Sequence, residues 1–126
     1  MHRCRFALLA AVTIAAGLVV HLGGSRLPDA VQDIAGDVLW ATMMAWWVGV
    51  VAPRTPVATR AAVAYTICVT VEFSQWLHTP ALDALRAIPG GHLILGSGFD
   101  PRDLLAYLGG VMLAVMIETR IARLSA

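Results

Sequence analysis

Long apolar runs separated by short polar clusters divide this chain into four segments. The runs cover residues 6–23, 34–52, 59–78 and 103–121, and proline, glycine and charged residues gather between them. Each run has about the 20 residues that a helix needs to cross the hydrocarbon core of a bilayer. A helix pairs its backbone groups internally, which lipid requires of any spanning segment. The pattern therefore predicts four membrane-spanning helices.

The first run has two interpretations. Arg3 and Arg5 precede it, and a basic start followed by an apolar stretch is also typical of a cleaved signal peptide. The run is long for a signal peptide, and no A-x-A cleavage pattern follows in residues 21–29. We favour an uncleaved first transmembrane helix.

The stretch between the third and fourth runs predicts a short surface helix. Residues 81–88 place three apolar side chains on one helical stripe and are followed by Gly90, which favours a helix end; the stripe consists of Leu82, Leu85 and Ile88. Residues 92–99 are too short to span as a helix, so we expect them to dip into the membrane interface or to cover the end of the bundle.

A proline and an acid mark the start of the fourth helix. Pro101 fits the first helical position, and the side chain of Asp103 can accept hydrogen bonds from the free amides there. The predicted fold is all-α. It is an integral membrane four-helix bundle, with a short interfacial helix in the last outer loop, forming a single transmembrane domain over residues 1–126.

Composition supports a membrane protein and argues against a nucleic-acid partner. Hydrophobic residues make up 59% of the chain and charged residues 13%, against roughly 25% charged residues in average soluble domains. The net charge is +1, without the clustered basic face that nucleic-acid binding requires. Membrane lipid is the expected partner.

The distribution of arginine predicts the orientation in the membrane. Cytoplasmic loops carry an excess of basic residues. Placing the amino terminus inside puts six arginines in the cytoplasm and three outside; the six are Arg3, Arg5, Arg54, Arg60, Arg120 and Arg123, and the three are Arg26, Arg86 and Arg102. We therefore predict a multi-pass protein of the cell inner membrane with both termini cytoplasmic.

Glu72 is the polar residue that most needs an explanation. It lies within the third apolar run, where a carboxylate costs a few kcal/mol on insertion scales and should face protein or water. Gln75 follows three residues later and shares the same helical face. The two side chains are predicted to point towards the other helices.

Other polar residues fall at the outer ends of the predicted helices and could meet Glu72 in one pocket. An ion pair of Glu72 with Arg86 or Arg102 would neutralise the acid. The hypothetical ligand-binding set is Asp37, Glu72, Gln75, Arg86, Arg102, Asp103 and Tyr107. Two alternatives stay open: polar pairs often only hold membrane helices together, and intramembrane acids also serve in proton or ion handling.

The remaining chemistry-bearing residues form no recognisable motif. His21, His78 and His92 have no metal-ligand spacing, and no nucleophile–base pair is evident, so neither a metal, a cofactor nor an enzyme activity is predicted. Cys4 and Cys68 are expected on different levels of the bundle, which argues against a disulfide. A face of small residues on the fourth helix favours close helix packing; it consists of Ala106, Gly110 and Ala114.

Three blocks of the chain resemble a bacterial membrane family catalogued as domain of unknown function 2809. They are GDVLW at 36–40, EFSQWLHTPALDALRA at 72–87 and HLILGSGFDPRDLLAYLGGVML at 92–113, and the shared order covers roughly residues 22–118. The Glu-x-x-Gln pattern followed by Arg-Asp and a glycine-containing helix is also similar to the wider VanZ-like group, known for teicoplanin resistance. That group has an asparagine where this chain has Tyr107 or a neighbour.

The resemblance implies a small inner-membrane protein but no reaction. Two functions remain as hypotheses. The first is non-enzymatic binding of a polar lipid headgroup or envelope precursor in an outer-side polar cavity. The second is a structural or partner subunit of a membrane complex, in which the polar residues only fix helix packing.

Overall fold

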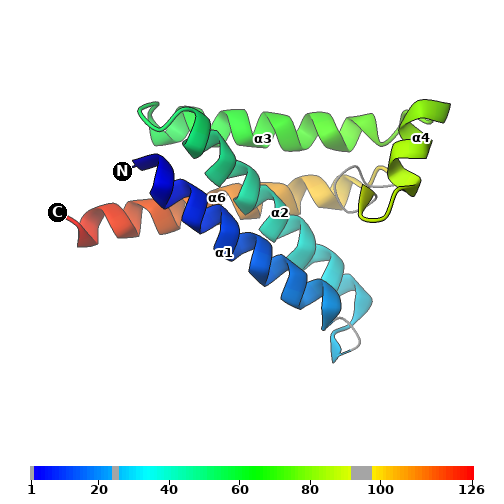
Figure 1. Ribbon diagram of the computed structural model, residues 1–126, viewed down its shortest axis with the longest axis horizontal. Helices are drawn as coiled ribbons and strands as arrows, with labels where there is room; N and C mark the ends of the chain where they lie inside the picture. The colour runs from blue at the N-terminus through cyan, green and yellow to red at the C-terminus, as the bar shows by residue number, and fades with distance from the viewer. Residues whose placement is uncertain (1, 24–25, 92–97) are drawn as a thin grey trace.

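A computed structural model describes residues 2–23, 26–91 and 98–126, and most of these residues are helical (Figure 1). The helices are α1 (His2–Leu22), α2 (Asp29–Val51), α3 (Val57–Ser74), α4 (Pro80–Ala87) and α6 (Pro101–Leu124). All except α4 are long and apolar enough to cross a membrane. The predicted all-helical bundle is confirmed for the described residues, and the chain is a multi-pass membrane protein. Residues 92–97, expected to cover the bundle end, lie outside the described residues.

Helix α2 is the centre of the bundle. It packs against α1, α3 and α6, and α3 also packs against α6. Both chain ends and the turn between α2 and α3 lie at one end of the bundle, while α4 crosses the far end of α3 (Figure 1). Consequently α2 and α6 run in the same direction, and their first turns lie towards the same side of the membrane.

The helices extend beyond the apolar runs that predicted them. Helix α2 begins at Asp29 instead of residue 34, directly after Pro28, and α6 continues to Leu124 instead of residue 121. An apolar run marks the part of a helix inside lipid, whereas the hydrogen-bonded backbone continues through polar residues outside it. The acidic side chain of Asp29 also favours the positive end of the helix dipole.

Helix α3, in contrast, ends earlier than its apolar run predicted, at Ser74 instead of residue 78. The backbone amides of residues 75–77 bond to carbonyls only three residues earlier, which tightens the last turn. The guanidinium of Arg86 then donates to the carbonyl oxygens of Ser74 at 3.2 Å and Leu77 at 2.8 Å. A cation at the carboxyl end of a helix satisfies its free carbonyls and its dipole.

Helix α4, predicted over residues 81–88, is capped at its start by the residue that precedes it. Thr79 accepts a hydrogen bond from the Leu82 amide at 3.2 Å, and Pro80 occupies the first turn. Its apolar stripe faces outwards: Leu85 is 49% exposed and Ile88 54% exposed. An exposed apolar stripe on a helix at the bundle end fits a position in the membrane interface.

Helices α2 and α6 approach each other closely at Gly110. The hydroxyl of Thr42 donates to the Gly110 carbonyl at 2.9 Å, and a Cβ atom on Gly110 would lie 2.2 Å from the carbonyl oxygen of Val38. Of the small-residue face predicted on α6, Gly110 and Ala114 are buried. This part of the face therefore packs against the other helices. Only glycine permits this contact.

Gly110→Ala is expected to lower the free energy of unfolding by about 1–3 kcal/mol, because the added methyl group forces α2 and α6 apart. Gly109→Ala is the matched control, since a Cβ there meets nothing within 4 Å. The control should be neutral or more stable by up to about 1 kcal/mol, through helix propensity. Thermal unfolding in detergent, followed by circular dichroism, measures both. Equal effects of the two substitutions would contradict the close approach.

Candidate functional site

Glu72 is completely buried and both of its carboxylate oxygens are hydrogen-bonded. Oε1 accepts from the backbone amide of Asp100 at 2.8 Å, and Oε2 accepts from the hydroxyl of Tyr107 at 2.9 Å. The acid thus joins α3 to the first turns of α6. A buried polar group is stable only when its hydrogen bonds are made, and these two donors meet that need.

The start of α6 is built to present these donors. Asp100 caps the helix by accepting from the Arg102 amide at 2.9 Å, which leaves its own backbone amide pointing to Glu72. Tyr107 is buried, and its ring packs against Trp40 of α2 with the ring centroids 5.6 Å apart. The hydroxyl of Tyr65 adds a second α3–α6 bridge, to the Leu104 carbonyl at 3.1 Å.

Two more acids lie close to Glu72. The carboxyl groups of Asp37 on α2 and Asp103 on α6 lie close enough together to interact, and Glu72 and Asp33 add to the negative charge there. Two carboxylates in contact repel each other unless a proton or a cation lies between them. The parallel course of α2 and α6 brings these acids together. We call Asp37, Asp103 and Glu72 the acidic cluster.

The structure therefore brings together part of the predicted set. Asp37, Glu72, Asp103 and Tyr107 gather at one end of the bundle, and Gln75 is buried about one helical turn beyond Glu72.

The expected ion pair of Glu72 with an arginine is wrong for the described residues. Arg86 instead donates to the carbonyl oxygens of Ser74 and Leu77 and forms an ion pair with Asp83, at 3.1 Å. Arg102 is exposed to solvent. Glu72 takes a tyrosine hydroxyl and a backbone amide instead, because these groups come from the helix that packs directly against it. A carboxylate can be satisfied by the free backbone amides at the start of a helix as well as by an opposite charge, and the expectation considered only the charge.

An aromatic group lies next to the acidic cluster in sequence and in space. Phe73 follows Glu72, and Phe99 precedes Asp100; the rings of Phe73 and Phe99 are stacked, with centroids 5.2 Å apart. Trp76 packs against Phe99 at 4.3 Å and is 62% exposed. Trp76 thus suits a position in the membrane interface, where tryptophan is enriched, whereas Trp40 is turned inwards onto Tyr107.

A second polar site, which the sequence analysis did not identify, lies at the opposite end of the bundle. Arg60 is 6% exposed and forms an ion pair with Glu118 of α6. It also donates to the carbonyl oxygens of Pro53, at 3.4 Å, and Thr55 in the α2–α3 turn. Its guanidinium carbon lies 5.0 Å from the centre of the Phe6 ring on α1. Arg60, a residue of α3, therefore contacts α1, α6 and the α2–α3 turn with one side chain.

A signal for this site was present in the sequence. Glu118 lies inside the fourth apolar run, and Arg60 lies just inside the third, on the side assigned to the cytoplasm. Opposite charges at the same depth of two membrane helices tend to pair with one another. The orientation argument used Arg60 only as a cytoplasmic charge and did not consider a pair with Glu118.

The fold and these two polar sites define the class of the protein: a multi-pass membrane bundle whose helices are joined by buried polar contacts at both ends. The model of a family described as Protein of unknown function (DUF2809) matches residues 26–111, more than half of the chain. The chain belongs to this family, as its sequence blocks predicted. No solved structure matches it.

Proposed function

We propose that this membrane protein binds a polar headgroup carrying an ammonium group, on a lipid or an envelope precursor, at the acidic cluster. The observation that carries the proposal is the proximity of two acids from different helices, Asp37 of α2 and Asp103 of α6. A cation placed between the two carboxyl groups relieves their repulsion. An ammonium group supplies that charge together with hydrogen-bond donors.

The surroundings of the acidic cluster support a headgroup as the ligand. Glu72 is held rigidly by Tyr107 and Asp100, so it adds negative charge without moving. Exposed Phe73 and Trp76 stand beside it, and aromatic side chains concentrate at the level of lipid headgroups. Aromatic faces also attract ammonium groups.

Orientation is part of the proposal. With both termini in the cytoplasm of a bacterial cell, the acidic cluster would face the outer leaflet of the inner membrane. The excess of arginine at the end that carries the termini supports this orientation.

A structural or partner subunit of a membrane complex is the second candidate. The complete pairing of Glu72 favours it, because an acid whose two oxygens are both bonded within the protein can act as a helix clamp alone. In that case the acidic cluster binds no lipid, and crosslinking in the membrane recovers another membrane protein in contact with this end of the bundle.

Lipid retention distinguishes the candidates. The protein is reconstituted in vesicles of equimolar phosphatidylethanolamine and phosphatidylglycerol with identical acyl chains, and retained lipids are measured by native mass spectrometry. Asp37→Asn/Asp103→Asn is expected to weaken retention of phosphatidylethanolamine about tenfold, equal to about 1.4 kcal/mol. Retention of phosphatidylglycerol should stay unchanged. The fold should survive, because the change removes repulsion.

Asp29→Asn is the control, an exposed acid on the same helix outside the acidic cluster. It should retain both lipids as the wild type does. Equal loss of phosphatidylethanolamine in the control, or no loss in the double variant, would reject headgroup binding at this site. In a deletion strain, altered lipid composition or glycopeptide sensitivity would support the proposal in the cell.

A further inference from the structure

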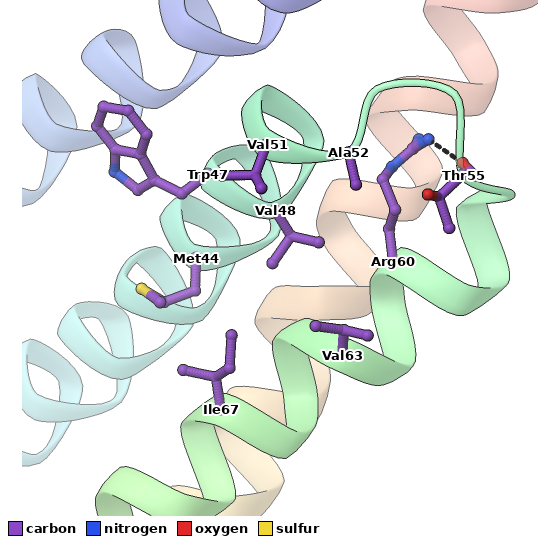
Figure 2. Close-up of a pocket in the computed structure, with 9 residues that line it drawn as sticks. All are labelled: Met44, Trp47, Val48, Val51, Ala52, Thr55, Arg60, Val63 and Ile67. Atoms are coloured by element: carbon purple, nitrogen blue, oxygen red, sulfur yellow. Dashed lines mark hydrogen bonds between the residues drawn. The ribbon is translucent and has the colours of Figure 1, made fainter.

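A groove of about 430 Å³ lies between α2 and α3 near the turn that joins them, at the end opposite to the acidic cluster. Figure 2 shows Met44 and Val48 of α2 facing Val63 and Ile67 of α3 across it, with Arg60 at its end. The lining residues extend over two turns of each helix, or about 10 Å. The groove therefore covers about a third of a hydrocarbon core roughly 30 Å thick.

The groove opens on the outside of the bundle. Its lining comes from α2, α3 and their turn, and three of its residues keep large exposed fractions: Trp47 43%, Val51 75% and Val63 45%. Both helices are long and apolar enough to span the membrane, so this surface faces lipid acyl chains. A hollow on such a surface has acyl chains as its nearest occupants.

The polar end of the groove carries positive charge. The charge of Arg60 is balanced by Glu118, whereas Arg54 in the α2–α3 turn is exposed. Arg5 adds a further positive charge nearby, since it lies 5.7 Å from the Phe6 ring that Arg60 also covers. A basic segment at the membrane surface attracts anionic headgroups, by about 1 kcal/mol per arginine.

We propose that the groove is a second lipid site, which holds one acyl chain of an anionic phospholipid with its headgroup beside Arg54. The apolar walls of Val48, Val63 and Ile67 contact the chain, and the turn places the headgroup at the interface. The volume is within the range of about 300–1,000 Å³ typical of sites for small ligands. This site is independent of the acidic cluster and carries the opposite charge preference.

The same vesicles of equimolar phosphatidylethanolamine and phosphatidylglycerol test the groove. Val63→Trp fills it from an exposed position, and Val12→Trp is the matched control on the lipid-facing side of α1, where Val12 is 59% exposed. Val63→Trp is expected to reduce retained phosphatidylglycerol at least tenfold in native mass spectra, while Val12→Trp does not. Arg54→Gln should abolish the preference for phosphatidylglycerol over phosphatidylethanolamine.

Several outcomes would overturn the proposal. Retention of phosphatidylglycerol by Val63→Trp at the wild-type level would exclude the groove as the binding site. A wild-type dimer that becomes monomeric in Val63→Trp would assign the groove to a second copy of the chain. Loss of phosphatidylethanolamine alone would implicate the acidic cluster, whose own variants are not expected to change phosphatidylglycerol retention.

Discussion

Replacing Arg60 with alanine is expected to lower the free energy of unfolding by about 3–5 kcal/mol, the cost of leaving one member of a buried ion pair without its partner. Glu118, whose side chain is only 18% exposed, would keep a charge with no cation beside it. The carbonyl oxygens of Pro53 and Thr55 would lose their donor, and Phe6 would keep only Arg5 over its ring. Chemical unfolding in detergent micelles measures the loss.

Arg54→Ala is the matched control, since Arg54 is an exposed arginine in the α2–α3 turn, six residues before Arg60. It should change the free energy of unfolding by less than about 0.5 kcal/mol, as surface substitutions usually do. The double variant Arg60→Met/Glu118→Leu should recover most of the loss, since removing both charges leaves neither unpaired. An Arg60→Ala variant as stable as Arg54→Ala would show that the ion pair does not hold this end together.

Glu72→Ala is expected to cost about 3 kcal/mol, because it leaves two buried donors, the Asp100 amide and the Tyr107 hydroxyl, without an acceptor. Glu72→Gln should cost less than about 1 kcal/mol. Its amide oxygen can accept from Asp100, and its NH₂ group can donate to the oxygen of Tyr107. Thermal unfolding of both variants in detergent separates a hydrogen-bonding role from a role of the charge.

A double-mutant cycle with Tyr107→Phe tests the contact itself. Residues that bond directly give non-additive losses, so Glu72→Ala/Tyr107→Phe should be less destabilised than the sum of the single variants. Additive losses would contradict the Glu72–Tyr107 bond. If Glu72→Gln is stable yet loses phosphatidylethanolamine retention, the carboxylate charge belongs to ligand binding. If it keeps both stability and retention, Glu72 serves packing alone.

The sequence by itself determined the four membrane-spanning helices and the family. Hydropathy is a local property, so runs of about 20 apolar residues indicate spans wherever the helices later pack. The start of α6 was equally local, since Pro101 fits a first helical turn, although the capping side chain is Asp100 and not Asp103. Burial of Glu72 also followed from its position alone, because lipid excludes an isolated carboxylate.

Only the tertiary structure decided which groups meet. Glu72 accepts hydrogen bonds from a backbone amide and a tyrosine hydroxyl and pairs with neither arginine. The reason is that helix packing, and not charge, determines which donors lie within reach. Arg60 and Glu118 pair across 58 positions, a relation that no local pattern encodes. Gly110 permits the close α2–α6 contact because the backbone of Val38 on α2 leaves no room there for a Cβ atom. Polar residues in a membrane must find partners, but the geometry of the bundle determines which ones.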